Sequence, residues 1–290
     1  MCLPDRVIRG RSMSHAIQFE DEMCVVGSYA EGKLLAGRID NVGILLFNQP
    51  EKRNAISLEM WDGVSAALDL LEGDRKVRIL IHAGAGGKAF TSGNDISQFA
   101  THRNNADANA EFTRITGRGR SRLVECTKPS IACIQGFCLG GGLATALLAD
   151  LRVCAADAVF GIPAARLGIA YGLAPMERLV GLVGPSRARL MLYTAGRFTA
   201  AEAHGMGLVD RVVETQDTVS ETLTLARSIA ENAPLSVQAA KFAIDQVLKA
   251  PHDRDIVSMD AFTSRCMNSA DYREGRAAFS EKRKPSFKGE

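Results

Sequence analysis

The chain has 290 residues, of which 46% are hydrophobic, which is enough for a sizeable buried core. Its 35 basic and 33 acidic residues leave a net charge of +2, far from the basic excess typical of nucleic-acid-binding proteins. No apolar run approaches the roughly 20 residues of a membrane-spanning helix. We therefore expect a soluble, cytoplasmic protein that has neither nucleic acid nor membrane as a partner.

The seven cysteines are an odd number, and several lie in apolar runs such as IACIQGFC, which favours reduced, buried thiols. There is no Cys-x-x-Cys pair and the five histidines are scattered, so we expect no metal site. The N-terminal stretch MCLPDRVIRGRSMSH lacks the apolar core of a secretory signal. We interpret residues 1–30 as a flexible N-terminal extension.

From about residue 34, short apolar runs alternate with helical segments, a pattern typical of an α/β domain. GILLF at 43–47 and RILIHA at 78–83 predict buried strands. Between them, apolar residues recur with helical spacing from Trp61 to Leu71, and Ser57 stands where a helix cap is expected. Strand, helix and strand are therefore predicted in this order.

The alternation continues through the middle of the chain. SIACIQGFC at 130–138 predicts one buried strand, 143–149 a short helix, and 150–163 two further short strands. The polar segment THRNNADANA at 101–110 either borders a ligand site or is an ordinary surface connection. After residue 173 the pattern indicates mainly helices.

Three consecutive glycines, Gly140 to Gly142, lie between the predicted strand and helix in the string IQGFCLGGGLATALLAD. Free N–H groups at the start of a helix stabilise negative charge, so this turn could hold a carbonyl oxygen that develops into an oxyanion. A tight packing turn and a phosphate-binding turn are the alternatives. No G-x-G-x-x-G follows the first strand, which argues against a dinucleotide site.

A second glycine-containing turn, GKAFTSGNDISQF at 87–99, also follows a predicted strand and contains Asn94 and Asp95. If the two turns converge, their N–H groups form an oxyanion hole with two donors. We expect the Asp95 carboxylate to have a structural role at the start of a helix.

Five segments are similar, in the same order, to signature segments of the enoyl-CoA hydratase/isomerase (crotonase) superfamily. They are NQPEKRNAIS (48–57), KAFTSGNDI (88–96), KPSIACIQGFCLGGGLATALLADLRV (128–153), GRFTAAEAHGMGLVDRVV (196–213) and AFSEKRKPSF (278–287). The resemblance implies an α/β fold with a crotonase-like spiral of β-β-α units over residues 31–205. It further implies a helical C-terminal oligomerisation region over residues 206–290 and a homotrimer or dimer of trimers.

The resemblance also implies a site for an acyl-CoA substrate. The N–H groups of Asn94 and Gly141 would bind the oxygen of a thioester enolate. Coenzyme A would arrive as part of the substrate, so no permanently bound cofactor is expected. The residues implied to contact coenzyme A are Lys52, Arg53, Ser92, Phe279 and Lys282, although Lys282 could equally be a solvated lysine of the basic run EKRKPSFK.

The chain departs from the pattern of the superfamily at two catalytic positions. Hydratases carry two glutamates that position water and transfer a proton, and the matching residues here are Ala144 and Ala164. The resemblance still implies a lyase-like or isomerase-like acyl-CoA enzyme, but ordinary hydration requires groups that these alanines lack.

Decarboxylation is one reaction that needs an enolate but less proton transfer, because loss of CO₂ itself generates the enolate. Tyr171, in RLGIAYG, resembles the tyrosine of the methylmalonyl-CoA decarboxylase branch and would contact the substrate. It could instead pack beside the site. A protein that binds acyl-CoA without catalysing a reaction is the remaining alternative.

Overall fold

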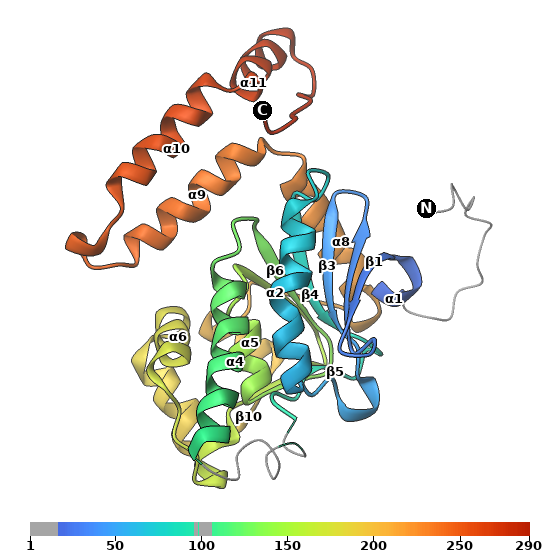
Figure 1. Ribbon diagram of the computed structural model, residues 1–290, viewed down its shortest axis with the longest axis vertical. Helices are drawn as coiled ribbons and strands as arrows, with labels where there is room; N and C mark the ends of the chain where they lie inside the picture. The colour runs from blue at the N-terminus through green and yellow to red at the C-terminus, as the bar shows by residue number, and fades with distance from the viewer. Residues whose placement is uncertain (1–16, 96–97, 99–105) are drawn as a thin grey trace.

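The computed structural model describes residues 17–95, 98 and 106–290, and its core consists of two β-sheets (Figure 1). The larger sheet has seven strands in the order β1 (Cys24–Tyr29), β2 (Leu34–Ile39), β3 (Val42–Phe47), β4 (Ile79–Gly84), β6 (Ser130–Ile134), β8 (Leu151–Ala155) and β11 (Arg211–Val213). The smaller sheet has four strands in the order β10 (Arg197–Thr199), β9 (Val159–Gly161), β7 (Phe137–Leu139) and β5 (Ala89–Thr91).

From β4 to β9, successive strands along the chain alternate between the two sheets. β4, β6 and β8 lie parallel in the larger sheet, and the strands that follow them, β5, β7 and β9, lie parallel in the smaller one. Helices α4 (Ala106–Val124) and α5 (Gly141–Ala146) follow the first two pairs, and η3 (Pro163–Leu167) with α6 (Leu173–Thr194) follows the third. This repetition confirms the predicted spiral of β-β-α units.

The centre of the larger sheet is covered on both faces, which explains why β3, β4 and β6 are buried at every position. In β3, Leu45 and Phe47 join the core against α2 (Leu58–Gly73). The alternate residues Ile44 and Leu46 join a second core against α8 (Thr218–Ala230). The short α1 (Phe19–Glu22) contributes Phe19 to this second core.

Helix α2 begins where the sequence predicts, because Ser57 accepts a hydrogen bond from the backbone N–H of Met60 at 3.3 Å. Its buried face runs from Trp61 to Leu71, as the apolar spacing indicates. Helix α4 packs beside α2, so the two form one layer over the sheet (Figure 1).

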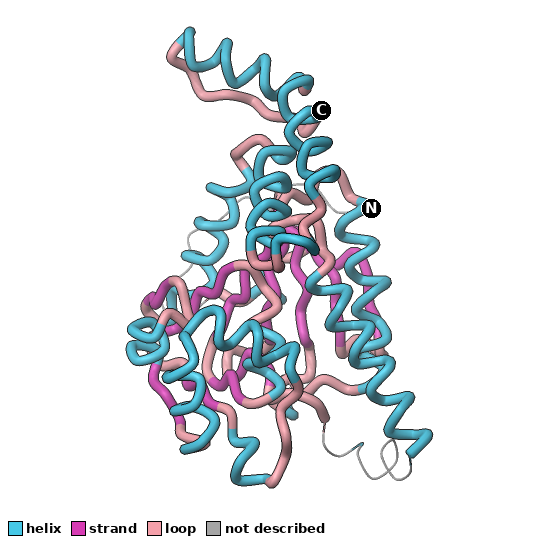
Figure 2. The backbone as a smooth tube through the Cα atoms, turned by 90° about the vertical axis from the view of Figure 1, so that its left-hand side faces the viewer, coloured by secondary structure: helices cyan, strands magenta, loops and turns pink. Residues whose placement is uncertain are grey.

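The last three helices form an arm that extends from the body of the molecule (Figures 1 and 2). They are α9 (Pro234–Val247), α10 (Ile256–Asn268) and α11 (Ala270–Glu281). Before them, α7 (Ala200–Met206), β11 and α8 pack against the body. The division at residue 205 stays a prediction. In the part of the chain that the structure describes, no helix combines the length and apolar character needed to cross a membrane.

Two predictions from the sequence differ from the structure. Residues 130–138 form two strands rather than one, because the chain turns at Gly136 and passes from the larger sheet into the smaller. The predicted N-terminal extension also contains β1, which pairs with β2 through a tight turn centred on Ala30 and Gly32. Residues 1–16 of that extension lie outside the described residues.

Of the six described cysteines, four agree with the prediction of reduced, buried thiols, while Cys266 is free but half-buried. Cys126, Cys133, Cys138 and Cys154 are buried free thiols. Burial raises the pKa of Cys126, Cys133 and Cys154 to about 12, so these groups stay protonated. Cys24, by contrast, is disulfide-bonded.

We predict that Gly136→Ala will destabilise the fold strongly. The residue has a φ of +59°, and an added Cβ would lie 2.1 Å from the Lys88 carbonyl oxygen. Strain and overlap together should cost on the order of 2–4 kcal/mol in the free energy of unfolding, measured in urea. Gly117→Ala is the control, since nothing lies within 4 Å of an added Cβ there and alanine suits a helix. Equal stabilities for the two variants would contradict this account of the turn.

Candidate active site

Three neighbouring strands of the smaller sheet end at the same edge, because β5, β7 and β9 are parallel and adjacent. Asn94 follows β5, and Gly141 follows β7. The segment from Ala164 to Tyr171 follows β9. Residues that are distant in the sequence are therefore brought to one edge by strand pairing alone.

The turn before Asn94 and the turn at Gly141 are in backbone contact. A Cβ atom added to Gly141 would lie 3.1 Å from Gly93 Cα and 3.4 Å from the Asn94 nitrogen. One added to Gly142 would lie 1.8 Å from the Thr91 carbonyl oxygen. Only glycine allows this approach, so the two predicted turns do converge.

The hydrogen bonds around Asn94 leave its own N–H group pointing away from the neighbouring segment. The Ile56 N–H donates to the Gly93 carbonyl at 2.7 Å, and the Asp95 N–H donates to the Ile56 carbonyl at 2.9 Å. Because N–H directions alternate along an extended chain, the intervening N–H of Asn94 faces the opposite side. Within the described residues, neither this N–H nor that of Gly141 donates to an acceptor.

Two side chains that the sequence analysis did not single out hold these turns in position. Trp61 Nε1 donates to Asn94 Oδ1 at 2.9 Å. Asn54 is fully buried, and its Nδ2 donates to the carbonyls of Ala85 and Ala89 at 2.9 and 2.8 Å. The sequence did hint at a structural role for Asn54, because it belongs to the segment NQPEKRNAIS. Asn54 adopts a left-handed backbone conformation with a φ of 54°, which asparagine tolerates better than most residues.

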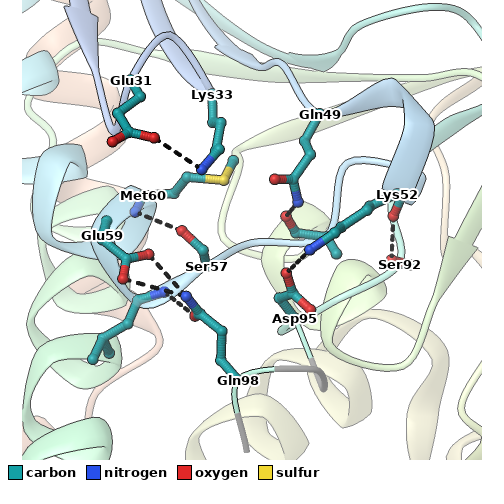
Figure 3. Close-up of polar contacts among 12 residues, drawn as sticks. Glu31, Lys33, Gln49, Lys52, Ser57, Glu59, Met60, Ser92, Asp95 and Gln98 are labelled. Carbon is teal, nitrogen blue, oxygen red and sulfur yellow. Dashed lines mark hydrogen bonds and ion pairs between the residues drawn. The ribbon is translucent and has the colours of Figure 1, made fainter. Parts of the chain in front are cut away.

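Three of the residues implied to contact coenzyme A, Lys52, Arg53 and Ser92, lie together, and Figure 3 shows Lys52 and Ser92 next to Asp95. The Ser92 N–H donates to the Arg53 carbonyl at 3.0 Å, and Lys52 precedes Arg53 at the end of η1 (Pro50–Lys52). Lys52 Nζ forms an ion pair with Asp95 Oδ2 at 2.9 Å. Asp95 is therefore an ion-pair partner that ties η1 to the Asn94 turn, which the sequence analysis did not foresee.

The other two residues implied to contact coenzyme A do not join this group within one chain. Phe279 is 88% exposed, and Lys282 ends helix α11 in a left-handed conformation. Helix α11 lies in the arm, far along the molecule from β5 and α5 (Figures 1 and 2). A single chain therefore does not unite all five positions.

Comparison with known proteins identifies the family. The sequence profile of the Enoyl-CoA hydratase/isomerase family matches residues 38–290. The chain belongs to this family. It is 37% identical over 254 residues to a crotonyl-CoA hydratase of Syntrophomonas wolfei, which covers 86% of this chain and 95% of that protein. It is 32% identical over 243 residues to a short-chain-enoyl-CoA hydratase of Clostridium acetobutylicum, covering 84% and 92% of the two chains.

The fold comparison agrees with the sequence comparison. A crystal structure of an enoyl-CoA hydratase/carnithine racemase from Magnetospirillum magneticum matches with a TM-score of 0.85 at 30% identity, covering 92% of this chain and 99% of that one. An enoyl-CoA hydratase from Bacillus anthracis matches with a TM-score of 0.82 at 30% identity, covering 89% and 100%. Membership of the crotonase superfamily is confirmed.

Ala144 and Ala164, the residues that the resemblance matches to the two glutamates of hydratases, lie beside the turns. Ala144 belongs to α5, and its N–H donates to the Gly140 carbonyl at 3.1 Å. Ala164 is buried in η3, next to Pro163, which lies 3.7 Å from a Cβ added to Gly140. Neither side chain can accept or donate a proton.

Tyr171 follows η3 at the same edge and is half-buried. Its Oη is buried and has no hydrogen-bond partner among the described residues. Burial raises the pKa of Tyr171 to about 12, and the charge of Arg120 opposes this shift. Tyr171 is therefore a neutral phenol at physiological pH, a hydrogen-bond donor rather than a base.

Arg120 is a further residue of this region that the sequence analysis missed. Its guanidinium lies 5.1 Å from the centre of the Trp61 ring. Its Nε is buried without a hydrogen-bond partner among the described residues. The local sequence GRGRSR gives no sign of burial, because arginines of this kind usually lie on a solvated face.

We predict that Tyr171 stays protonated at about pH 10.5, above the ordinary pKa of tyrosine. Ultraviolet absorbance should show the same amount of tyrosinate in the native protein and in Tyr171→Phe at this pH. Since the raised pKa favours the neutral form in the folded state, the stabilisation that it provides is complete below pH 10.0 and is lost as pH rises through about 12. One extra tyrosinate in the native protein at pH 10.5 would contradict the burial of this phenol.

Proposed function

We propose that this protein binds an acyl-CoA thioester and stabilises the thioester enolate with the N–H groups of Asn94 and Gly141. The observation that carries the proposal is the backbone contact between the Gly93–Asn94 turn and Gly141, with both N–H groups unpaired among the described residues. Two donors fixed in this way stabilise charge as it develops on the oxygen, without reorganisation during the reaction.

Ordinary hydration of an enoyl-CoA is disfavoured, because Ala144 and Ala164 supply no acid or base. Decarboxylation of a malonyl-type thioester needs neither. The bond between the α carbon and the carboxylate breaks, its electron pair forms the enolate, CO₂ leaves, and the α carbon takes a proton from water. The Tyr171 phenol would donate a hydrogen bond to the acyl group during this step.

The second candidate is a protein that binds acyl-CoA without converting it. The same two alanines support it, since they remove both proton carriers of the family while the oxyanion turns remain. Such a protein would still hold the thioester oxygen between Asn94 and Gly141.

We further propose that the arm makes contacts between subunits in a homotrimer or a dimer of trimers. Its apolar side chains are too exposed for an isolated chain, with Val247 at 67%, Leu248 at 78% and Val257 at 81%. In an oligomer, Phe279 and Lys282 would bind the coenzyme A of a neighbouring subunit. This would explain why they lie far from Asn94 in their own chain although the family resemblance implies that they contact coenzyme A.

We predict turnover of at least one member of a panel of enoyl-, 3-hydroxyacyl- and malonyl-type CoA esters, followed by mass spectrometry. Calorimetry with the same esters separates the two candidates. Binding without product would favour the non-catalytic protein, and product would favour the enzyme. A folded protein that neither binds nor converts any ester would refute the proposed function.

We predict that Gly141→Pro will lower kcat by about 10² to 10³-fold on an ester that is turned over, because one oxyanion donor is lost. Gly141 is the first residue of α5, where proline removes no helical hydrogen bond, but its added Cβ would lie 3.1 Å from Gly93 Cα. Urea unfolding shows whether the crowding near Gly93 disturbs the fold. Gly181→Ala on the exposed face of α6, where an added Cβ meets nothing within 4 Å, is the control with expected native activity. Native kcat in a folded Gly141→Pro protein would refute the role of this N–H.

We predict that Val257→Glu on α10 will reduce the oligomer to smaller species in light scattering, because a buried carboxylate at a subunit contact is costly. Thr224→Glu on the exposed face of α8 should leave the mass unchanged. If the native protein has the mass of one chain, the arm has another use and the proposed assembly is wrong.

A further inference from the structure

Helix α4 carries four arginines, and three of them form ion pairs, one within the helix and the others to acidic residues of α2. These pairs join Arg114 to Glu111, Arg118 to Asp62, and Arg122 to both Asp69 and Glu72. The three arginines recur every four residues, so they share one face of the helix. Arg120 is two residues from Arg118, which turns it roughly 200° away from that face.

Arg120 alone of the four has no acidic partner among the described residues. Its guanidinium packs on the Trp61 ring of α2 instead, 5.1 Å from the ring centre. An added Cβ on the adjacent Gly119 would lie 2.8 Å from the same ring, so helix and ring are in close contact here. A cation that is withdrawn from water without an anion is costly, and burial accordingly lowers the pKa of Arg120.

Tyr171 carries a second unsatisfied donor, within electrostatic range of Arg120. Its Oη is buried without a partner among the described residues, like Arg120 Nε. The charges of Arg120 and Tyr171 influence each other's pKa, and Tyr171 is similarly coupled to Cys138 of β7. Tyr171 follows β9, the strand beside β7, and β7 leads directly to the Gly140–Gly142 turn, so Tyr171 lies at the same strand edge as the oxyanion site.

Trp61 connects Arg120 to the oxyanion turn. One face of its indole meets the Arg120 guanidinium, and its Nε1 donates to Asn94 Oδ1 at 2.9 Å. The guanidinium therefore lies one indole ring away from the side chain of a proposed oxyanion residue. An acyl group whose thioester oxygen is at Asn94 would extend into this neighbourhood.

We propose that Arg120 and Tyr171 form a subsite for a carboxylate on the acyl group, so that the substrate is the CoA thioester of a dicarboxylic acid. The inference rests on the proposed function, which fixes the thioester oxygen at Asn94 and Gly141. A carboxylate accepts several hydrogen bonds, and the guanidinium and phenol supply donors for them. A neutral acyl chain would leave both donors unpaired, which is how such sites reject the wrong substrate.

The position of the carboxylate decides how Arg120 would affect a reaction. In a malonyl ester the carboxylate is itself lost as CO₂, and its negative charge moves to the thioester oxygen. An arginine on that carboxylate stabilises the ground state more than the transition state, so it raises affinity more than rate. In a succinyl or glutaryl ester the carboxylate is retained, and the arginine contributes throughout the reaction.

The test is calorimetric binding of malonyl-, succinyl- and glutaryl-CoA, compared with acetyl- and butyryl-CoA as neutral esters. We expect the native protein to bind at least one carboxylated ester roughly 10-fold or more tightly than the neutral ones. Arg120→Gln should weaken that ester by about 10- to 100-fold, the range for loss of a charged hydrogen bond, and leave neutral esters nearly unchanged. Arg120→Lys should retain part of the preference, because it keeps the charge without the planar fork.

Arg118→Gln is the matched control, since this arginine lies on the same helix but pairs with Asp62 outside the site. It should bind every ester like the native protein. Urea unfolding separates ligand binding from a structural role: Arg120→Gln should be at least as stable as the native protein, because it removes an unpaired charge from a shielded position. Lower stability with equal weakening of charged and neutral esters would overturn the inference.

The outcomes also separate this inference from the proposed function. If neutral esters bind the native protein as tightly as carboxylated ones, the carboxylate subsite is wrong and the oxyanion site stands. If no CoA ester of either class binds, the proposed function fails and the subsite fails with it. Tightest binding of malonyl-CoA would indicate a carboxylate that leaves as CO₂, and tightest binding of succinyl- or glutaryl-CoA would indicate a carboxylate that is retained.

Discussion

The geometry of the candidate site depends on the backbone contact between Gly93 and Gly141. Parallel pairing of β5 and β7 puts two strand ends side by side, but it does not by itself bring their turns within van der Waals distance. The absence of side chains at Gly93, Gly141 and Gly142 does so, since a Cβ at any of them would meet backbone atoms at 3.1 Å or less. The turns can then direct N–H groups toward one oxygen.

The contact is supported from outside both turns, by the segment that leads into α2. Asn54 bridges the carbonyls of Ala85 and Ala89, which flank the approach to β5. Trp61 fixes the Asn94 side chain from the first turn of α2. A change in the packing of α2 would therefore shift the position of Asn94 even if the residues of both glycine turns stayed the same.

The long apolar runs, the glycine turns and the short strand β9 could be predicted from the sequence, whereas the separate small sheet and the inward arginine could not. β3 is an uninterrupted apolar strand and β4 is interrupted only by His82, so both are recognisable as buried strands. β5 and β7 have three residues each, too few to show a period, and the break at Gly136 depends on the approach of Lys88. The orientation of Arg120 depends on which face of α4 meets Trp61. Its spacing did indicate a different face of the helix, because Arg114, Arg118 and Arg122 recur every four residues and Arg120 does not.

The electrostatic character of the site follows from the two alanines as much as from the arginine. In hydratases of the family, the resemblance implies two carboxylates near the thioester, which could neutralise a neighbouring cation. Under this alignment Ala144 and Ala164 would supply neither anion, while Arg120 is partly buried with no anion beside it among the described residues. A shielded guanidinium is most stable with a counter-ion. Under the proposed function the acyl group is the part of the ligand that reaches this space, and a carboxylate on it would supply that counter-ion.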